Sequence, residues 1–195
     1  MSRKETHDPA LVAEIAAHYR EILRLIGEDP AREGLVKTPE RAAKALLDAT
    51  CGYHADVKSM SQKAIFEHEG SGMVMVRGIE IYSLCEHHIL PFFGTVTIAY
   101  IPDGKIIGLS KLGRIADAFA RRLQVQERLT RQLCDFLTEA IPNKGVIVSC
   151  AARHLCMQMR GVEKQLSETR TLEYSGEFAS RPELRMEFLN LASKG

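Results

Sequence analysis

Two short stretches of the chain carry cysteine and histidine at spacings suited to a metal ion. In CEHH, Cys85 and His88 stand three residues apart, so one tight turn can direct a thiolate and an imidazole at the same ion. In RHLC, His154 and Cys156 stand two apart, which in a strand would place both side chains on one face. Cys85, His88 and Cys156 form a Cys2His set, which is typical of catalytic zinc with an open fourth position. We therefore predict a catalytic Zn2+ site.

Two further imidazoles, His87 and His154, stand beside the predicted ligands. If three ligands suffice, both can move protons near neutral pH, and having two indicates a reaction with several proton transfers. Alternatively, either histidine could close the tetrahedron and make the zinc structural, or could support a ligand through a hydrogen bond. Ligand softness favours zinc, although iron(II) could occupy the same residues.

A possible anion site lies at residues 110–114. Ser110, Lys111 and Arg114 stand at a predicted helix start, with Ser110 as its cap, where free N–H groups and the macrodipole disfavour cations and favour a bound phosphate. Arg160 would share the strand face of Cys156 and point toward the metal. We therefore expect a phosphate-bearing substrate between the zinc and this helix; the alternative is a solvated basic face.

Three other side chains are candidates for contacting such a substrate. Arg41 and Lys44 stand three apart on one face of a predicted helix, where they could add positive charge or could simply be solvated. Glu127 stands at the start of another predicted helix, where the dipole alone favours a carboxylate. It could also accept the adjacent N–H groups of guanine. The sequence leaves both alternatives open in each case.

Hydrophobic periodicity predicts the elements that hold these side chains. Strands are expected at residues 73–84 and 94–101, helices from 110 and from 125, then a β-rich segment from 146, a short strand at 169–175 and a terminal helix. Because neighbouring strands are joined by short connections, this order indicates an α+β domain. We predict an antiparallel four-stranded sheet with two helices on one face.

Upstream of this domain, two helices are expected to form a hairpin. Asp8 with Pro9, and Thr38 with Pro39, are pairs typical of a helix cap and first turn. We assign residues 1–60 to this N-terminal helical hairpin region and residues 61–195 to the catalytic domain. The length allows one substantial core with a small helical appendage.

The overall composition limits the classes of partner. The 26 Lys and Arg residues nearly balance the 25 Asp and Glu, so a net charge of +1 gives no global attraction to nucleic acid or an acidic membrane. The start of the chain has no apolar signal region, and no later stretch is long and apolar enough to span a membrane. We expect a cytoplasmic protein. Its cysteines outside the zinc set, Cys51, Cys134 and Cys150, are predicted to be core residues.

The segments CEHH, GLSKLGRIADAFARRLQVQERLT and RHLCMQMRG, in this order, resemble the signature segments of GTP cyclohydrolase I. The resemblance runs from about residue 38 to residue 188. It implies a tunnelling fold, with subunit sheets joined edge to edge into a pentameric barrel, two pentamers stacked as a homodecamer, and active sites at subunit interfaces. It also implies conversion of GTP and water to formate and 7,8-dihydroneopterin triphosphate, the first step of pterin and folate biosynthesis.

The same resemblance assigns roles to individual residues. Cys85, His88 and Cys156 match the zinc ligands of the family, and His87 and His154 match its two catalytic histidines. The remaining matches concern the nucleotide: Glu127 for guanine, Ser110 near the ribose, Lys111, Arg114 and Arg160 for the triphosphate, and Arg41 and Lys44 as further phosphate-binding cations from a neighbouring subunit.

The implied reaction begins when water, activated at the zinc, attacks the five-ring CH carbon of guanine. His154 is expected to protonate the adjacent ring nitrogen, and His87 to serve the later ribose rearrangement and ring closure. One segment, residues 172–175, departs from the small hydroxyl residues usual in the family. It bears on assembly rather than on chemistry, because it belongs to the last predicted strand.

Two rival functions remain. One is another tunnelling-fold catalyst, either a three-histidine zinc synthase or a zinc-free reductase with a nucleophilic cysteine, and CEHH together with HLC disfavours both. The other is a non-catalytic regulator with a closed zinc site and a purine-sensing pocket. The two spare histidines disfavour this reading.

Overall fold

The structure is a computed structural model that describes residues 7–193. The first six residues, which belong to the segment examined for a targeting signal, lie outside this range. The chain divides into two units, one ending at Cys51 and the other beginning at Gly52. Among the described residues, no helix combines the length and apolar character that crossing a membrane requires.

The first unit is the predicted pair of helices, α1 (Pro9–Leu25) and α2 (Thr38–Ala49). The prediction for the first cap is confirmed, because the Asp8 carboxylate accepts a hydrogen bond from the Ala10 N–H at 2.9 Å. The second is wrong: Thr38 is the first helical residue and Lys37 occupies the cap position without a side-chain hydrogen bond. The helix therefore starts one residue earlier than predicted. In the turn before it, the Thr38 N–H already donates a hydrogen bond to the Leu35 carbonyl.

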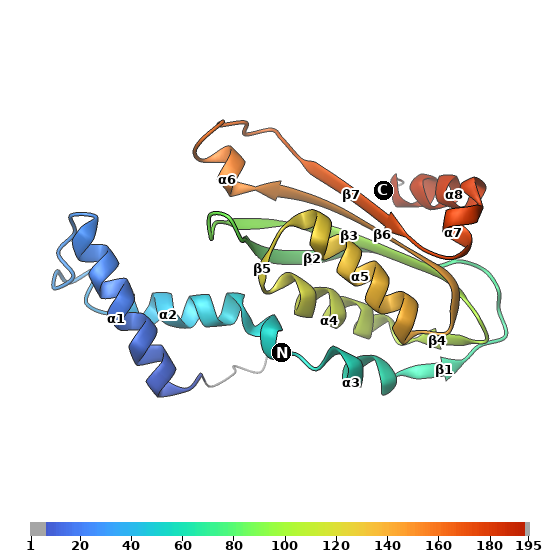
Figure 1. Ribbon diagram of the computed structural model, residues 1–195, viewed down its shortest axis with the longest axis horizontal. Helices are drawn as coiled ribbons and strands as arrows, with labels where there is room; N and C mark the ends of the chain where they lie inside the picture. The colour runs from blue at the N-terminus through green and yellow to red at the C-terminus, as the bar shows by residue number, and fades with distance from the viewer. Residues whose placement is uncertain (1–6, 194–195) are drawn as a thin grey trace. The chain divides into compact units, whose positions relative to one another are not determined.

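The second unit is an α+β structure, as predicted (Figure 1). Its helical elements are the 3-10 turn η1 (Cys51–His54), which straddles the boundary, α3 (Val57–Gln62), α4 (Leu109–Ala120), α5 (Gln126–Ala140), α6 (Leu155–Gln158), α7 (Glu177–Ser180) and α8 (Pro182–Ser193). Its strands are β1 (Ile65–Glu67), β2 (Val74–Cys85), β3 (Pro91–Pro102), β4 (Lys105–Ile107), β5 (Leu123–Gln124), β6 (Asn143–His154) and β7 (Thr169–Tyr174).

The main sheet has five strands, in the order β5-β2-β3-β6-β7, whereas four were predicted. The four long strands are antiparallel neighbours. The additional strand, β5, contains only two residues and pairs in parallel with Leu84 and Cys85 at the end of β2. Two residues are too few to show a period-2 pattern, which explains why the sequence did not reveal this strand. Strands β1 and β4 form a separate two-stranded sheet.

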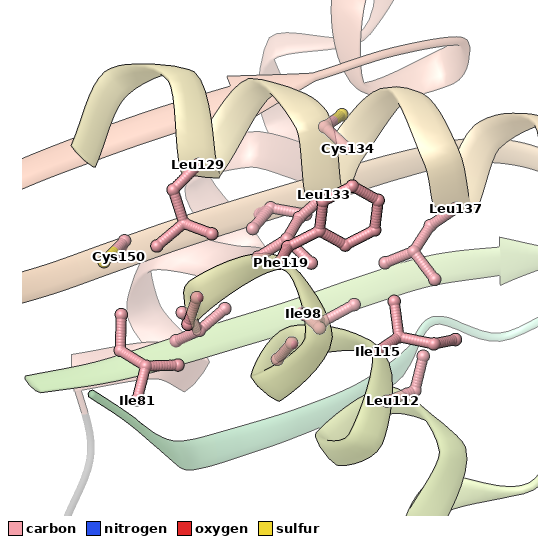
Figure 2. Packing of buried hydrophobic residues seen from close by; sticks show 14 of the residues in the cluster. Ile81, Ile98, Leu112, Ile115, Phe119, Leu129, Leu133, Cys134, Leu137 and Cys150 are labelled. Carbon is pink, nitrogen blue, oxygen red and sulfur yellow. The ribbon is translucent and has the colours of Figure 1, made fainter. Parts of the chain in front are cut away.

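The principal core lies between one face of the sheet and the predicted helices α4 and α5 (Figure 2). Leu129, Leu133 and Leu137 recur along α5 at a spacing of four and are fully buried, so they form one apolar stripe. This stripe packs against inward residues of the strands such as Ile98. The packing holds α5, and therefore its first residues, in a fixed position on the sheet.

A smaller core lies on the opposite face of the sheet. Ala99 and Ile147, which alternate with residues of the principal core, pack there with Phe178 of α7 and Phe188 of α8. The terminal helix therefore covers the face that α4 and α5 leave open. The sequence predicted this helix but did not assign it to a face.

Candidate metal centre

The β2–β3 connection brings the first two predicted ligands together. Cys85 is the last residue of β2, and its N–H donates to the Leu90 carbonyl at 2.9 Å. Its carbonyl accepts hydrogen bonds from the N–H groups of His88, at 3.3 Å, and Ile89, at 2.8 Å. Ile89 has a φ of 55°, an unusual value for a β-branched residue. The chain thus folds back tightly, and Cys85 Sγ and His88 Nδ1 lie 3.7 Å apart.

The third predicted ligand, Cys156, lies on a helical turn and not in a strand. Strand β6 ends at His154, which pairs with Phe92, the second residue of β3. Since β3 begins at Pro91, β6 loses its partner there and the chain turns into α6. The expectation that Cys156 and Arg160 continue the strand face of His154 is therefore wrong.

Nevertheless, the predicted ligand set converges. One ligand atom from each of Cys85, His88 and Cys156 lies within 4.8 Å of the others. Cys85 is buried, Cys156 is half-buried and His88 is exposed, so the cluster opens to the surface on one side. Burial, and then the neighbouring Cys85, raise the pKa of the Cys156 thiol. Two adjacent thiolates repel each other, and a divalent cation between them removes that penalty.

His87 lies on the same turn, with Nδ1 4.0 Å from Cys85 Sγ, and its side chain is 63% exposed. Its neighbour Glu86 forms a two-pronged ion pair with Arg128 of α5. The Arg128 guanidinium holds the pKa of Glu86 below its usual range. The Glu86–Arg128 ion pair therefore links the β2–β3 turn to α5. Sequence reasoning did not identify it, because its two residues are far apart in the chain.

His154 is held from two sides. Its ring stacks on Phe92, with centroids 4.6 Å apart and an interplanar angle of 7°. Its Nε2 lies 2.8 Å from Oε1 of Gln126, the first residue of α5. Burial lowers the pKa of His154, and the charge of Glu127 opposes this shift. Glu127 stands in the first turn of α5, as predicted, its side chain is exposed, and its charge acts on His154.

The comparisons with known proteins agree with this arrangement. A sequence model described as GTP cyclohydrolase I matches residues 15–193. GTP cyclohydrolase 1 of Bacteroides thetaiotaomicron is 50% identical over 195 residues, covering 100% of this chain and 98% of that protein. GTP cyclohydrolase 1 of Leptospira biflexa is 57% identical over 175 residues, covering 90% and 96%. The chain belongs to the GTP cyclohydrolase I family.

Membership in the GTP cyclohydrolase I family makes the chain an enzyme. Among solved structures, the apo form of the archaeosine synthase QueF-Like matches 55% of this chain and 97% of that chain, with 18% identity and a TM-score of 0.44. That likeness is too low to establish a shared fold. The finding for the fold is therefore the α+β architecture described above.

Arg160, one of the cations predicted to bind phosphate, lies close enough to Cys156 for its charge to act on that thiol. It follows α6, it is exposed, and its positive charge counteracts the raised pKa of Cys156. Its charge therefore acts on the metal centre from this chain, although the strand geometry expected for it is absent.

Ser110 and Lys111 stand in the first turn of α4, and Arg114 stands in the middle of the helix. Figure 1 shows α4 along the sheet. The last turn of α4 is near Cys85, because the Gln124 side chain bonds to the Phe119 carbonyl and Gln124 pairs with Cys85. From Phe119, the helix extends roughly 14 Å to Ser110. Ser110 is also not the cap, since Gly108 occupies that position and the helix begins at Leu109. Ser110 and Lys111 are therefore at the end of α4 far from Cys85, with Arg114 between the two ends.

Arg41 and Lys44 both lie on α2, in the first unit. Lys44 Nζ contacts Glu40 Oε1 at 2.5 Å, an ion pair between residues four apart on the helix. Arg41 is exposed. Lys44 thus has a partner on its own helix.

Proposed function

We propose that the chain converts GTP and water to formate and 7,8-dihydroneopterin triphosphate at a zinc centre formed by Cys85, His88 and Cys156. The observation that carries this proposal is the convergence of the three ligand atoms within 4.8 Å, in a chain of the GTP cyclohydrolase I family. His87 and His154 flank this cluster and supply the two imidazoles that the reaction requires.

The donor set fits zinc. Two thiolates and one imidazole are ligands that zinc prefers, and the exposed side of the cluster leaves a position for water or substrate. Iron(II) would accept the same three donors. When bound, the metal supplies Lewis acidity that makes water a stronger nucleophile near neutral pH.

The two histidines move the protons of the reaction. His154, held by Phe92 and Gln126, donates a proton to the five-ring nitrogen of guanine as water adds to the neighbouring carbon. The exposed His87 serves the later transfers, in which formate leaves and the ribose rearranges before ring closure. Glu127, exposed at the start of α5, accepts the N–H groups of the guanine edge and holds the base in register.

The triphosphate is held by cations from more than one subunit. Arg160 contributes from the chain that holds the zinc. Ser110 and Lys111 stand in the first turn of α4 and Arg114 in its middle, whereas the end of α4 near Cys85 is its last turn. We therefore assign the three α4 residues to the site of a neighbouring copy, together with Arg41 and Lys44 of α2. In this arrangement the active site is complete only in an oligomer.

The sheet edges support a ring assembly. Among residues 7–193, no strand pairs with the outer edge of β7, or with β2 before Leu84. Unpaired edges of this length favour pairing with another chain. We propose that β7 of one subunit pairs with β2 of the next in the tunnelling-fold barrel of a pentamer, and that two pentamers form a homodecamer. The thiol ligands and the buried Cys134 and Cys150 suit a reducing compartment, which supports a cytoplasmic location.

Incubation of the purified protein with GTP, with and without a chelator, tests the function. We expect release of formate together with a fluorescent pterin, and loss of both products in the chelator. The matched variant Cys85→Ser should lose both products without a chelator. Binding of GTP without any turnover would contradict the proposal and would instead indicate a purine sensor.

A further inference from the structure

Gln126 lies beside His154, and both polar atoms of its side chain form hydrogen bonds. The proposed reaction gives this residue no role. It is the first residue of α5 and is only 1% exposed. Its Oε1 faces His154 Nε2 at 2.8 Å. In a buried amide, both the NH2 donor and the oxygen acceptor must form hydrogen bonds. The orientation of the amide therefore shows which neighbouring groups accept and which donate.

The surroundings of the Gln126 amide nitrogen determine which end of the amide faces His154. Nε2 lies 3.1 Å from the Cys150 carbonyl oxygen and 3.0 Å from that of Thr169, on β6 and β7. Rotating the amide by 180° would place Oε1 against these two carbonyl oxygens, neither of which can donate a hydrogen. The NH2 group therefore points at the two strands, and Oε1 points at His154.

Two threonine hydroxyls complete the same network. Thr130 Oγ1 donates to the backbone carbonyl of Gln126 at 2.9 Å. Thr171 Oγ1 lies 2.6 Å from Thr130 Oγ1 and therefore donates to it, since the Thr130 hydrogen is already used. Thr171 Oγ1 in turn accepts from Gln126 Nε2 at 3.2 Å. The two hydroxyl hydrogens are thus assigned, and the two hydrogens of Gln126 Nε2 face three acceptors, the two carbonyl oxygens and Thr171 Oγ1. The network therefore agrees with Oε1 as the acceptor that faces His154.

An acceptor oxygen 2.8 Å from an imidazole nitrogen requires a hydrogen on that nitrogen. His154 must then carry its proton on Nε2, and in the neutral ring the lone pair is on Nδ1. No described group forms a hydrogen bond with Nδ1. Stacking on Phe92 fixes the plane of the ring, while Gln126 fixes its rotation and its tautomer.

We propose that Gln126 is a positioning residue that locks His154 in the Nε2–H tautomer, so that Nδ1 is the nitrogen that exchanges protons with the substrate. The proton exchange rests on the proposed function, but the tautomer does not. In the addition step, a proton on Nδ1 of the imidazolium passes to the five-ring nitrogen of guanine. Nε2 keeps its own proton throughout, because that proton remains bonded to Gln126.

The direct test is 15N NMR of the zinc-loaded, histidine-labelled protein, with the His154 signals assigned by their absence from a His154→Asn variant. At a pH where His154 is neutral, we expect a protonated Nε2 and an unprotonated Nδ1. The opposite tautomer in the unmodified protein would overturn the proposal. This measurement needs no turnover, so it remains decisive even if the protein releases no formate, which would contradict only the proposed function.

The matched variants are Gln126→Met and Gln132→Met. Both replace a glutamine of α5 by an apolar side chain of similar length, but Gln132 bonds to Gln124 and not to His154. We expect Gln126→Met to lose the preference for Nε2–H and to lower kcat about 10- to 100-fold with little change in the KM for GTP. Gln132→Met should keep both. A raised KM with unchanged kcat in Gln126→Met would show a substrate contact and overturn the positioning role.

Discussion

At the scale of single residues, four of the five cysteines fall into two chemical environments, and the fifth, Cys51, is half-buried and not in either core cluster, so its prediction as a core residue is not confirmed. Burial raises the pKa of Cys134 to about 11 and that of Cys150 to about 12, so both thiols stay protonated at neutral pH. Both lie in the principal core, as the sequence predicted. Cys85 and Cys156 instead meet at the open cluster, where a metal would hold them as thiolates.

Alkylation with iodoacetamide should distinguish these two environments. At pH 8, mass spectrometry should find Cys134 and Cys150 unmodified with or without a chelator, whereas Cys85 and Cys156 should become modified only after metal removal. Burial and Cys85 raise the pKa of Cys156, so its thiol ionises at a higher pH than an ordinary cysteine thiol does. In the presence of chelator, the alkylation rate of Cys156 should therefore keep increasing at pH values above the pKa of an ordinary thiol. Equal labelling of Cys156 with and without chelator would argue against its role as a ligand.

His154→Ala tests the assignment of the first proton transfer. The variant keeps the metal ligands and the guanine carboxylate, so it should bind GTP with an affinity close to that of the unmodified protein. Loss of general acid catalysis should reduce formate release by about 100- to 10,000-fold. The measurement pairs calorimetric GTP binding with a formate assay. Turnover at the normal rate would remove His154 from the mechanism.

The sequence predicted the three residues that converge at the cluster but not the side chains that support the residues around it. Cys85, His88 and Cys156 are recognisable because few other roles require thiol and imidazole groups at such spacing. Gln126 is an ordinary polar residue in QVQERLT, and its role depends on carbonyl groups of β6 and β7. Folding alone brings those groups together, from positions 24 and 43 residues away in the chain.

At the scale of elements, the β3–β6 pairing joins the two halves of the site. Its register places Phe92 opposite His154 and Gly94 opposite Ala152. A Cβ atom on Gly94 would lie 2.0 Å from the Ala151 carbonyl oxygen and 2.6 Å from the Cα of Ala152. Both are backbone atoms of a central strand, so neither can move without breaking the pairing.

Gly94→Ala should therefore destabilise the protein by about 1–3 kcal/mol or more and reduce activity through loss of the Phe92–His154 contact. Gly113→Ala on α4 is the matched control, because its Cβ would meet nothing within 4 Å. In the interior of a helix it should stabilise by about 0.4–1 kcal/mol. Denaturant unfolding of both variants measures these changes. A Gly94→Ala variant as stable as the unmodified chain would mean that the two strands are not so closely apposed.

The long elements were predictable and the short ones were not. Strands β2, β3 and β7 and helices α1, α2, α4, α5 and α8 carry enough residues to show a period, and the sequence located them to within a few residues. The turn α6 was interpreted as strand, since His154 and Cys156 alternate as strand residues do. Tertiary structure decided against the strand: β3 begins at Pro91 and offers β6 no further partner.

At the scale of the whole molecule, the position of Ser110 and Lys111 on α4 underlies our proposal that sites are shared between copies. In residues 172–175, which were predicted to bear on assembly, Glu173 pairs with Arg131 of α5 at 3.7 Å. Tyr174 lies under the Arg185 guanidinium of α8, 5.0 Å from its ring centroid. These side chains have partners above and below the sheet, and so leave the backbone edge of β7 available for another strand.

Mixing two inactive variants tests the shared site. Cys85→Ser removes a proposed metal ligand, and Lys111→Ala removes a proposed triphosphate contact in the first turn of α4. Each variant alone should be nearly inactive, but subunits mixed by reversible dissociation should form some sites with an intact ligand set and an intact neighbour. Formate release should then reappear. Its absence, in mixed oligomers confirmed by mass spectrometry, would contradict sites built from neighbouring copies.

The most direct test of the central claim is reconstitution of chelated protein with measured amounts of zinc. Bound zinc and formate release from GTP are followed in the same samples. We predict that formate release rises in proportion to bound zinc, reaches its limit at one ion per chain, and does not return in Cys85→Ser. Formate release that does not depend on bound zinc, or a protein loaded with one zinc per chain that releases none, would contradict the account.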